Sequence, residues 1–152
     1  MPPLVSTLER ISPKPHFIPQ RRVLLVDEEA CDRERYAQHL RDRGLRVRAC
    51  SSYEEGERCL EGERFDLVIV DQGGPAFEGK AVAARSMVKD RRVPVLVTTR
   101  HHNMAAYMEA MQLGAADYLE KPIPVHEFLW RIGTHLPSGW VKTRRASWRS
   151  RG

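Results

Sequence analysis

The chain has 152 residues, which is enough for one globular domain of ordinary size and too few for two. With 41% hydrophobic and 30% charged residues, its composition is that of a folded soluble protein, and it excludes fibrous and low-complexity classes. The formal net charge is +5, and five basic residues fall in the last 13 positions, which contain no acid. The other 20 basic residues equal the 20 acidic residues in number, so the net positive charge belongs to a basic tail.

No segment of the sequence has the features of a membrane span or an export signal. The longest wholly apolar runs, such as Val23 to Val26, are far shorter than the roughly 20 residues that cross a bilayer. The N-terminus lacks the apolar centre of a signal peptide. The three cysteines, Cys31, Cys50 and Cys59, are an odd number without metal-binding spacing, which favours reduced and mostly buried thiols. We therefore expect a cytoplasmic location.

The chain divides into three parts. Residues 1–20 contain five prolines and no sustained apolar period, which predicts an extended or disordered leader. Residues 21–137 alternate apolar runs with amphipathic stretches, and this part is the expected folded domain. Residues 138–152 form the basic, flexible tail.

Five strands are predicted in the folded part, each followed by a helical segment: Val23–Val26, Arg46–Cys50, Leu67–Val70, Val93–Thr98 and Tyr118–Glu120. The second strand alternates polar and apolar residues and the fifth is short, so both belong at sheet edges. The sequence therefore predicts an α/β fold of the flavodoxin-like, doubly wound (βα)5 class, with a parallel sheet in the order 2-1-3-4-5.

Helix signals support this arrangement. Ser52 with Glu55 is a capping-box pattern that starts the second helix, and Gly44 marks the end of the first. Apolar residues repeat at helical spacing in two later segments and are expected to pack on the sheet. The first set is Met104, Tyr107, Met108 and Met111, and the second is Val125, Phe128, Leu129, Ile132 and Leu136.

Polar residues follow four of the predicted strands. Asp27 and Glu28 leave the first strand, Asp71 ends the third, Thr99 follows the fourth and Lys121 follows the fifth. In an open parallel sheet these carboxyl ends share one rim, where ligands bind at the reversal of strand order. These five side chains are therefore expected to converge.

Clustered carboxylates repel one another unless a cation neutralises them, and an all-oxygen acidic set suits Mg²⁺. Lys121 is then placed to contact phosphoryl oxygens, Thr99 to donate a hydrogen bond, and Asp71 to act as the nucleophile that forms an aspartyl phosphate. The alternative is that such Asp and Thr residues merely cap the following helices. Their joint occurrence at four strand ends favours the phosphoryl-acceptor site.

From about Arg22 to Leu136 the sequence resembles the receiver domain of two-component response regulators. The resemblance is carried by Val23-Leu24-Leu25-Val26-Asp27-Glu28, by Asp71 with Pro75 and Gly79, by Val97-Thr98-Thr99 and by Lys121-Pro122. It implies a signalling domain rather than a metabolic enzyme. The implied partners are a sensor histidine kinase or histidine phosphotransfer protein upstream and a protein target downstream.

The resemblance also implies roles for individual residues. Asp27, Glu28, Asp71 and the backbone carbonyl of Gly73 would hold Mg²⁺, Asp71 would be the phosphoacceptor, and Lys121 would contact the phosphoryl group. Thr99 and Tyr118 would be the switch residues. The readout, and a homodimer if one forms, would use the face made by the fourth helix, fifth strand and fifth helix.

The sequence departs from the family pattern at Arg100, because the position after the switch threonine usually holds a small residue. Four arrangements of Arg100 are open. Its side chain would cover the phosphoryl group on Asp71 or pair with the phosphoryl oxygens. Alternatively, it would occupy the site itself and so mimic activation, or it would turn to solvent. The two histidines that follow it, His101 and His102, are expected to be solvated loop residues.

Three other functions remain as alternatives. A degenerate receiver would act as a protein-interaction scaffold without phosphorylation. The unusual Arg100 argues for this hypothesis, and the presence of both Asp71 and Lys121 argues against it. A haloacid dehalogenase-type phosphohydrolase would need a second aspartate two residues after the nucleophile, where this chain has Gly73. Finally, aromatic and basic residues interleave in the tail, a pattern that fits binding to nucleic acid.

Overall fold

The structure is a computed structural model that describes residues 20–136. The predicted leader, apart from Gln20, and the predicted basic tail lie outside the described residues, and so does the proposed binding of nucleic acid through that tail.

Strands and helices alternate throughout the described part of the chain. No helix within residues 20–136 is long and apolar enough to cross a membrane. The strands are β1 (Arg22–Val26), β2 (Arg46–Cys50), β3 (Leu67–Asp71), β4 (Val95–Thr99) and β5 (Asp117–Glu120). The helices are α2 (Ala30–Arg41), α3 (Tyr53–Gly62), α4 (Lys80–Lys89), α5 (Met104–Leu113) and α6 (Val125–His135).

The five strands form one parallel sheet in the order β2-β1-β3-β4-β5, which confirms the predicted fold class and strand order. The predicted edge strands are also confirmed. β3 and β4 are buried almost throughout, as expected for strands covered on both faces, whereas β2 alternates between exposed and partly buried residues.

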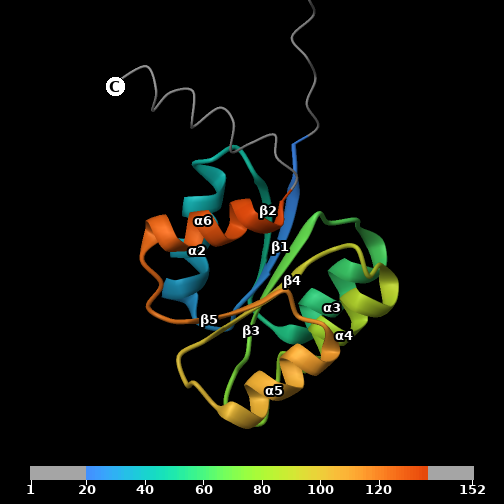
Figure 1. Cartoon of the computed structure of the whole chain (residues 1–152). Helices are drawn as coiled ribbons and strands as arrows, with labels where there is room; N and C mark the ends of the chain where they lie inside the picture. Colours follow the sequence, from blue (N-terminus) through green and yellow to red (C-terminus); the bar gives the residue numbers. More distant parts are fainter. Residues whose placement is uncertain (1–19, 137–152) are drawn as a thin grey trace, which may run out of the picture.

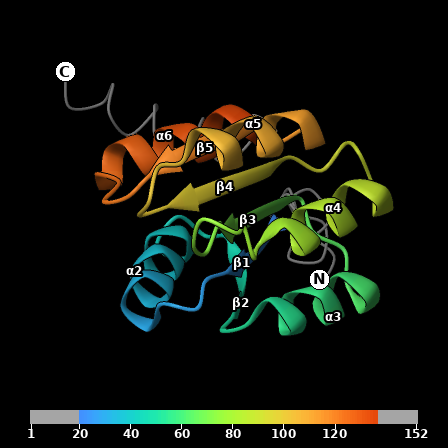
Figure 2. The ribbon, with the colours of Figure 1, turned by 90° about the horizontal axis from the view of Figure 1, so that it is seen from below.

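Helices cover both faces of the sheet, as Figures 1 and 2 show. Helices α3, α4 and α5 pack on one face and α2 and α6 on the other. Alternate residues of β1 serve the two layers: Leu24 and Val26 belong to the core under α3 to α5, and Val23 and Leu25 to the core under α2 and α6. The central strands β1, β3 and β4 are thus shielded from water on both faces, and their polar groups lie near the strand ends.

Local signals set two helix boundaries as the sequence predicted. The Ser52 side chain accepts a hydrogen bond of 3.2 Å from the Glu55 N–H and begins α3. After α2, Gly44 adopts the left-handed conformation with φ of +83°, and the Leu45 N–H donates to the Leu40 carbonyl at 3.2 Å. This turn directs the chain into β2.

The expected burial of the methionine stripe on α5 is wrong. Met104, Met108 and Met111 are 63%, 48% and 39% exposed, whereas Ala106 and Ala110 are buried on the opposite side of the helix. The helix has two apolar stripes of the same period, and the one with small side chains faces the sheet. The stripe on α6 packs as expected through Phe128, Leu129, Ile132 and Leu136, with Val125 exposed at its start.

The cysteines are free thiols, as predicted, but only two of them are buried. Cys31 is exposed because it lies outside the buried face of α2, which is formed by Asp32, Tyr36, Ala37 and Leu40. Cys50 and Cys59 are buried with their Sγ atoms 3.5 Å apart, so they pack β2 against α3.

Replacing Gly79 by alanine tests how tightly the loop after β3 is packed. A Cβ atom at this position would lie 2.2 Å from the Asp71 carbonyl oxygen, a backbone atom that cannot rotate away. We expect Gly79→Ala to lower the free energy of unfolding by about 1–3 kcal/mol, measured by urea denaturation. Gly62→Ala is the matched control, since no heavy atom outside its own helical turn and chain neighbours lies within 4 Å of its added Cβ. Equal stability of the two variants would contradict the close approach.

Candidate functional site

The site lies at the carboxyl ends of the central strands, and its centre is the ammonium group of Lys121. This residue directly follows β5 and its side chain is 1% exposed. Its Nζ atom lies 2.6 Å from Oδ2 of Asp27, which follows β1, and 2.7 Å from Oδ1 of Asp71, the last residue of β3. The end of the sheet therefore brings three of the predicted site residues into direct contact.

Asp71 is held by its neighbours but remains open to solvent. Its Oδ2 accepts a hydrogen bond of 3.0 Å from the Gly73 N–H, and its Oδ1 accepts one of 3.3 Å from the Thr98 hydroxyl. The side chain is 15% exposed, compared with 2% for Asp27. Asp71 is thus the carboxylate of this pair that an incoming group can reach.

A third carboxylate, that of Asp32 on α2, also contacts Lys121. The Oδ2 atom of Asp32 lies 3.1 Å from Nζ, and the side chain is 1% exposed. Arg100, directly after β4, binds the same carboxylate with two nitrogens, at 3.0 Å and 2.5 Å. Arg100 is half exposed, yet its guanidinium is engaged by Asp32 rather than turned to solvent, which corrects that alternative.

Burial and ion pairing compete in setting the protonation of these groups. Burial raises the pKa of Asp27, and the hydrogen bond from Lys121 only partly offsets this effect. For Asp32 burial acts in the same direction, but the hydrogen bonds from Arg100 and Lys121 prevail and lower its pKa. Burial also opposes the charge on Lys121, but hydrogen bonds to Asp27 and Asp71 raise its pKa. Lys121 is therefore a cation.

The site has a deficit of positive charge. Asp27, Asp32 and Asp71 supply three carboxylates to two cations, Lys121 and Arg100, and Glu28 adds an exposed carboxylate at the rim. Within residues 20–136, no three or more His, Cys, Asp or Glu side chains are arranged so that they could hold a metal ion as they stand. The reason is that the aspartates converge on Lys121 instead. All the available donors are oxygens, however, and this donor set with its charge deficit fits Mg²⁺.

The two predicted switch residues are connected through a buried glutamine. Tyr118 on β5 donates from its hydroxyl to Oε1 of Gln72, which is fully buried. The amide nitrogen of Gln72 donates to the carbonyl oxygens of Gly74, at 3.1 Å, and His101, at 3.4 Å. The Thr99 hydroxyl accepts a hydrogen bond of 2.9 Å from the His101 N–H. Gln72 thus ties the loop after Asp71 to the loop after Thr99 and to Tyr118.

Sequence reasoning missed Asp32, Gln72 and the Thr98 hydroxyl. The sequence does indicate that Asp32 is buried, because it lies four residues before Tyr36 and eight before Leu40, on the buried stripe of α2. An acid on such a stripe needs a cation nearby. His101 and His102 are exposed in the loop, as predicted, although the backbone of His101 takes part in the network.

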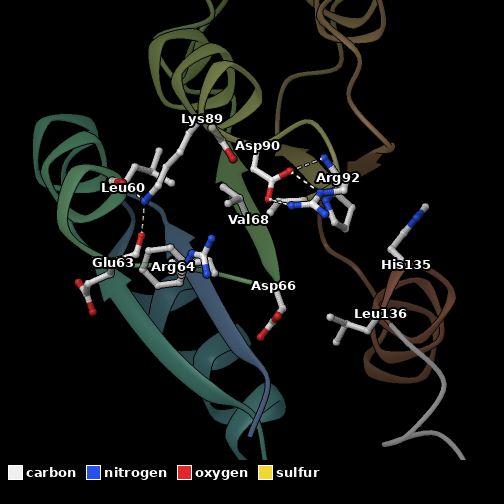
Figure 3. Close-up of a pocket in the computed structure, with 14 residues that line it drawn as sticks. Leu60, Glu63, Arg64, Asp66, Val68, Lys89, Asp90, Arg92, His135 and Leu136 are labelled. Carbon is white, nitrogen blue, oxygen red and sulfur yellow. Dashed lines mark hydrogen bonds and ion pairs between the residues drawn. The ribbon is translucent and has the colours of Figure 1, made fainter. Parts of the chain in front are cut away.

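A separate cavity of about 670 Å³ lies at the opposite end of the sheet. Its lining includes Asp66, just before β3, and Pro94, just before β4, and Figure 3 shows it between α3, α4 and the end of α6. Lys89 is tied to the carbonyls of Leu60 and Glu63, and Arg92 is paired with Asp90. Lys89 and Arg92 are thus both engaged, and none of the predicted site residues lines this cavity.

Comparison with known proteins identifies the family. The family model of the response regulator receiver domain matches residues 23–132. The transcriptional regulator of alginate biosynthesis AlgB, from Pseudomonas aeruginosa, is 35% identical over 103 residues, which cover 68% of this chain and 23% of AlgB. The virulence transcriptional regulator PhoP, from Salmonella typhimurium, is 32% identical over 111 residues, which cover 73% of this chain and 50% of PhoP.

Solved structures agree with the family match. The non-phosphorylated receiver domain of HemR from Leptospira biflexa is 28% identical, with a TM-score of 0.69 over 76% of this chain and 94% of that domain. The present chain spans about half the length of PhoP and about a quarter of AlgB. The chain therefore belongs to the response regulator receiver domain family of two-component signalling.

Proposed function

We propose that the chain is an active phosphoacceptor, in which Asp71 takes a phosphoryl group from a histidine kinase or histidine phosphotransfer protein. The observation that carries this proposal is the buried Lys121, whose Nζ lies 2.6 Å from Asp27 and 2.7 Å from Asp71. A lysine held in this position is ready to contact a phosphoryl oxygen once Asp71 is modified.

In the transfer step a carboxylate oxygen of Asp71 attacks phosphorus while the bond from phosphorus to the donor histidine nitrogen breaks. The nitrogen keeps the electron pair, and no proton is needed on Asp71. The hydrogen bond from Gly73 N–H to Oδ2 and that from Thr98 to Oδ1 orient the carboxylate. Lys121 offsets the negative charge that gathers on the phosphoryl oxygens.

Mg²⁺ would be held by Asp27, Glu28, Asp71 and the carbonyl oxygen of Gly73. When bound, the ion supplies the positive charge that the three carboxylates and the phosphoryl group lack. Glu28 is exposed, so its side chain is free to turn toward an ion. Gly73, with φ of +86°, adopts the left-handed conformation without steric cost, as a glycine can.

The signal would leave the site through the loop after β4. A phosphoryl group adds negative charge and strong acceptors beside Thr99, whose hydroxyl is now engaged with the His101 N–H. Turning that hydroxyl toward the phosphoryl group releases the loop, and Gln72 transmits the change to Tyr118. Thr99 and Tyr118 are the switch residues in this proposal.

The output surface would be the face formed by α5, β5 and α6. Met104, Met108 and Met111 expose an apolar stripe on α5, and Trp130 on α6 is 67% exposed. Flexible methionines suit a surface that packs against a protein target or a second copy of the chain. This surface supports signalling through protein contacts, and membership of the family supports a cytoplasmic location.

Beryllofluoride with Mg²⁺, which mimics an aspartyl phosphate, tests the switch directly. We expect it to shift the backbone NMR resonances of Thr99 and Tyr118 in the wild type, because the new anion competes for the Thr99 hydroxyl. Asp71→Ala, which has no carboxylate to hold the mimic, is expected to show no shift. No change in either protein would instead support a degenerate receiver that acts as a scaffold without phosphorylation.

Arg100→Ala tests the role of the extra cation. Its removal makes the site more negative, so beryllofluoride binding is expected to weaken by roughly threefold to tenfold, measured by fluorescence or calorimetric titration. Arg92→Ala is the matched control, since Arg92 is an exposed arginine paired with Asp90 at the other end of the sheet. Tighter binding in Arg100→Ala would show instead that Arg100 obstructs the site.

A further inference from the structure

One buried polar atom beside the site has no partner. The Tyr53 hydroxyl, on the first residue of α3, is shielded from solvent and forms no hydrogen bond with any residue in the range 20–136. Buried hydroxyl groups are almost always paired, and an orphan donor in a native structure requires an explanation. One explanation is a ligand that supplies the acceptor.

The start of α3 fixes the position of this hydroxyl. Ser52 caps the helix directly before Tyr53, and the Tyr53 ring packs against the core under α3 to α5. One turn later, Gly56 brings the helix backbone against the end of β1. A Cβ at Gly56 would lie 2.7 Å from Cγ2 of Val26, the residue before Asp27. The ring is therefore anchored beside the rim that carries Asp27.

The hydroxyl lies against the loop that follows Asp71. A Cβ atom added to Gly73 would come within 2.9 Å of the Tyr53 hydroxyl and 2.8 Å of a carboxylate oxygen of Glu78. Gly73 donates its N–H to Asp71, and its carbonyl is one of the proposed Mg²⁺ ligands. Tyr53 thus adjoins the segment that would surround a bound phosphoryl group and its metal ion.

The charges around Tyr53 are negative. Burial is the main cause that raises the pKa of its phenol, and the carboxylates of Asp71, Glu28 and Asp27 raise it further. A phenol is protonated at neutral pH even at its ordinary pKa, so the Tyr53 hydroxyl can act as a donor. A neutral donor facing several carboxylates is suited to an anionic acceptor held among them.

We propose that the Tyr53 hydroxyl donates a hydrogen bond to the oxygen atoms of the phosphorylated, Mg²⁺-bound site. The acceptor is a phosphoryl oxygen on Asp71 or a water molecule on the metal ion. This inference rests on the proposed phosphoacceptor function and adds a binding residue, from the first turn of α3, to those that the sequence motifs indicate.

The test compares Tyr53→Phe with the wild type in the 152-residue chain. The substitution removes one oxygen and keeps the ring, so the urea unfolding midpoint without ligand is expected to stay the same or rise. Affinity for beryllofluoride with Mg²⁺ is expected to fall about tenfold, the usual effect of losing a hydrogen bond to a charged group. Tyr107→Phe, on α5, is the matched control and should bind as the wild type does.

The ¹³C chemical shift of tyrosine Cζ, measured by NMR on labelled protein, reports on hydrogen bonds of the hydroxyl. If Tyr53 had a purely structural role, its shift would not change when the ligand binds. A shift of the Tyr53 signal with Mg²⁺ alone identifies the metal-bound water as acceptor, and a shift only after beryllofluoride is added identifies a phosphoryl oxygen. Wild-type affinity in Tyr53→Phe together with an unmoved Tyr53 signal would overturn the inference and leave the proposed function intact. Failure of the wild type itself to bind the mimic would overturn both.

Discussion

The arrangement of the site depends on one buried lysine shared among three carboxylates. Each of these groups alone would be costly to bury, since an unpaired charge in the interior is strongly destabilising. Lys121 stays charged because Asp27 and Asp71 contact it, and Asp32 stays charged because Lys121 and Arg100 bind it. The ends of β1, β3, β4 and β5 and the first turn of α2 are thereby linked. The same charges leave the site short of positive charge, a deficit that the proposed Mg²⁺ would offset.

The cluster is confined to the strand ends because the central strands are apolar over most of their length. The residues of β1 and β3 that precede Asp27 and Asp71 are buried under helices on both faces, so polar groups are confined to the strand ends. Small residues bring the surrounding loops close. Gly79 lies against the Asp71 backbone and Gly56 against Val26, so both the loop after β3 and the start of α3 adjoin the rim. The fold therefore supplies a rigid frame and two adjacent segments that contact the site.

Much of the fold could be predicted from the sequence, because apolar strand runs and helix caps are local signals. The order of strands, the edge strands and the Ser52 cap follow from such patterns. The methionine stripe on α5 could not be placed from its period, since Ala106 and Ala110 form a competing stripe and packing decides between them. Asp32, Gln72 and Tyr53 also depend on contacts between distant segments: the Arg100–Asp32 pair joins residues 68 positions apart. Motifs indicate the nucleophile and the lysine, whereas tertiary contacts reveal what surrounds them.

Phosphoryl incorporation from acetyl phosphate, followed by intact-mass and peptide mass spectrometry, tests the central claim most directly. The account predicts that the wild type gains the mass of one phosphoryl group in the presence of Mg²⁺ and that the modified peptide contains Asp71. It also predicts that Asp71→Asn, or chelation of the metal ion, abolishes the gain. An unmodified wild type, or a phosphoryl group that persists in Asp71→Asn, would contradict the assignment of Asp71 as the phosphoacceptor.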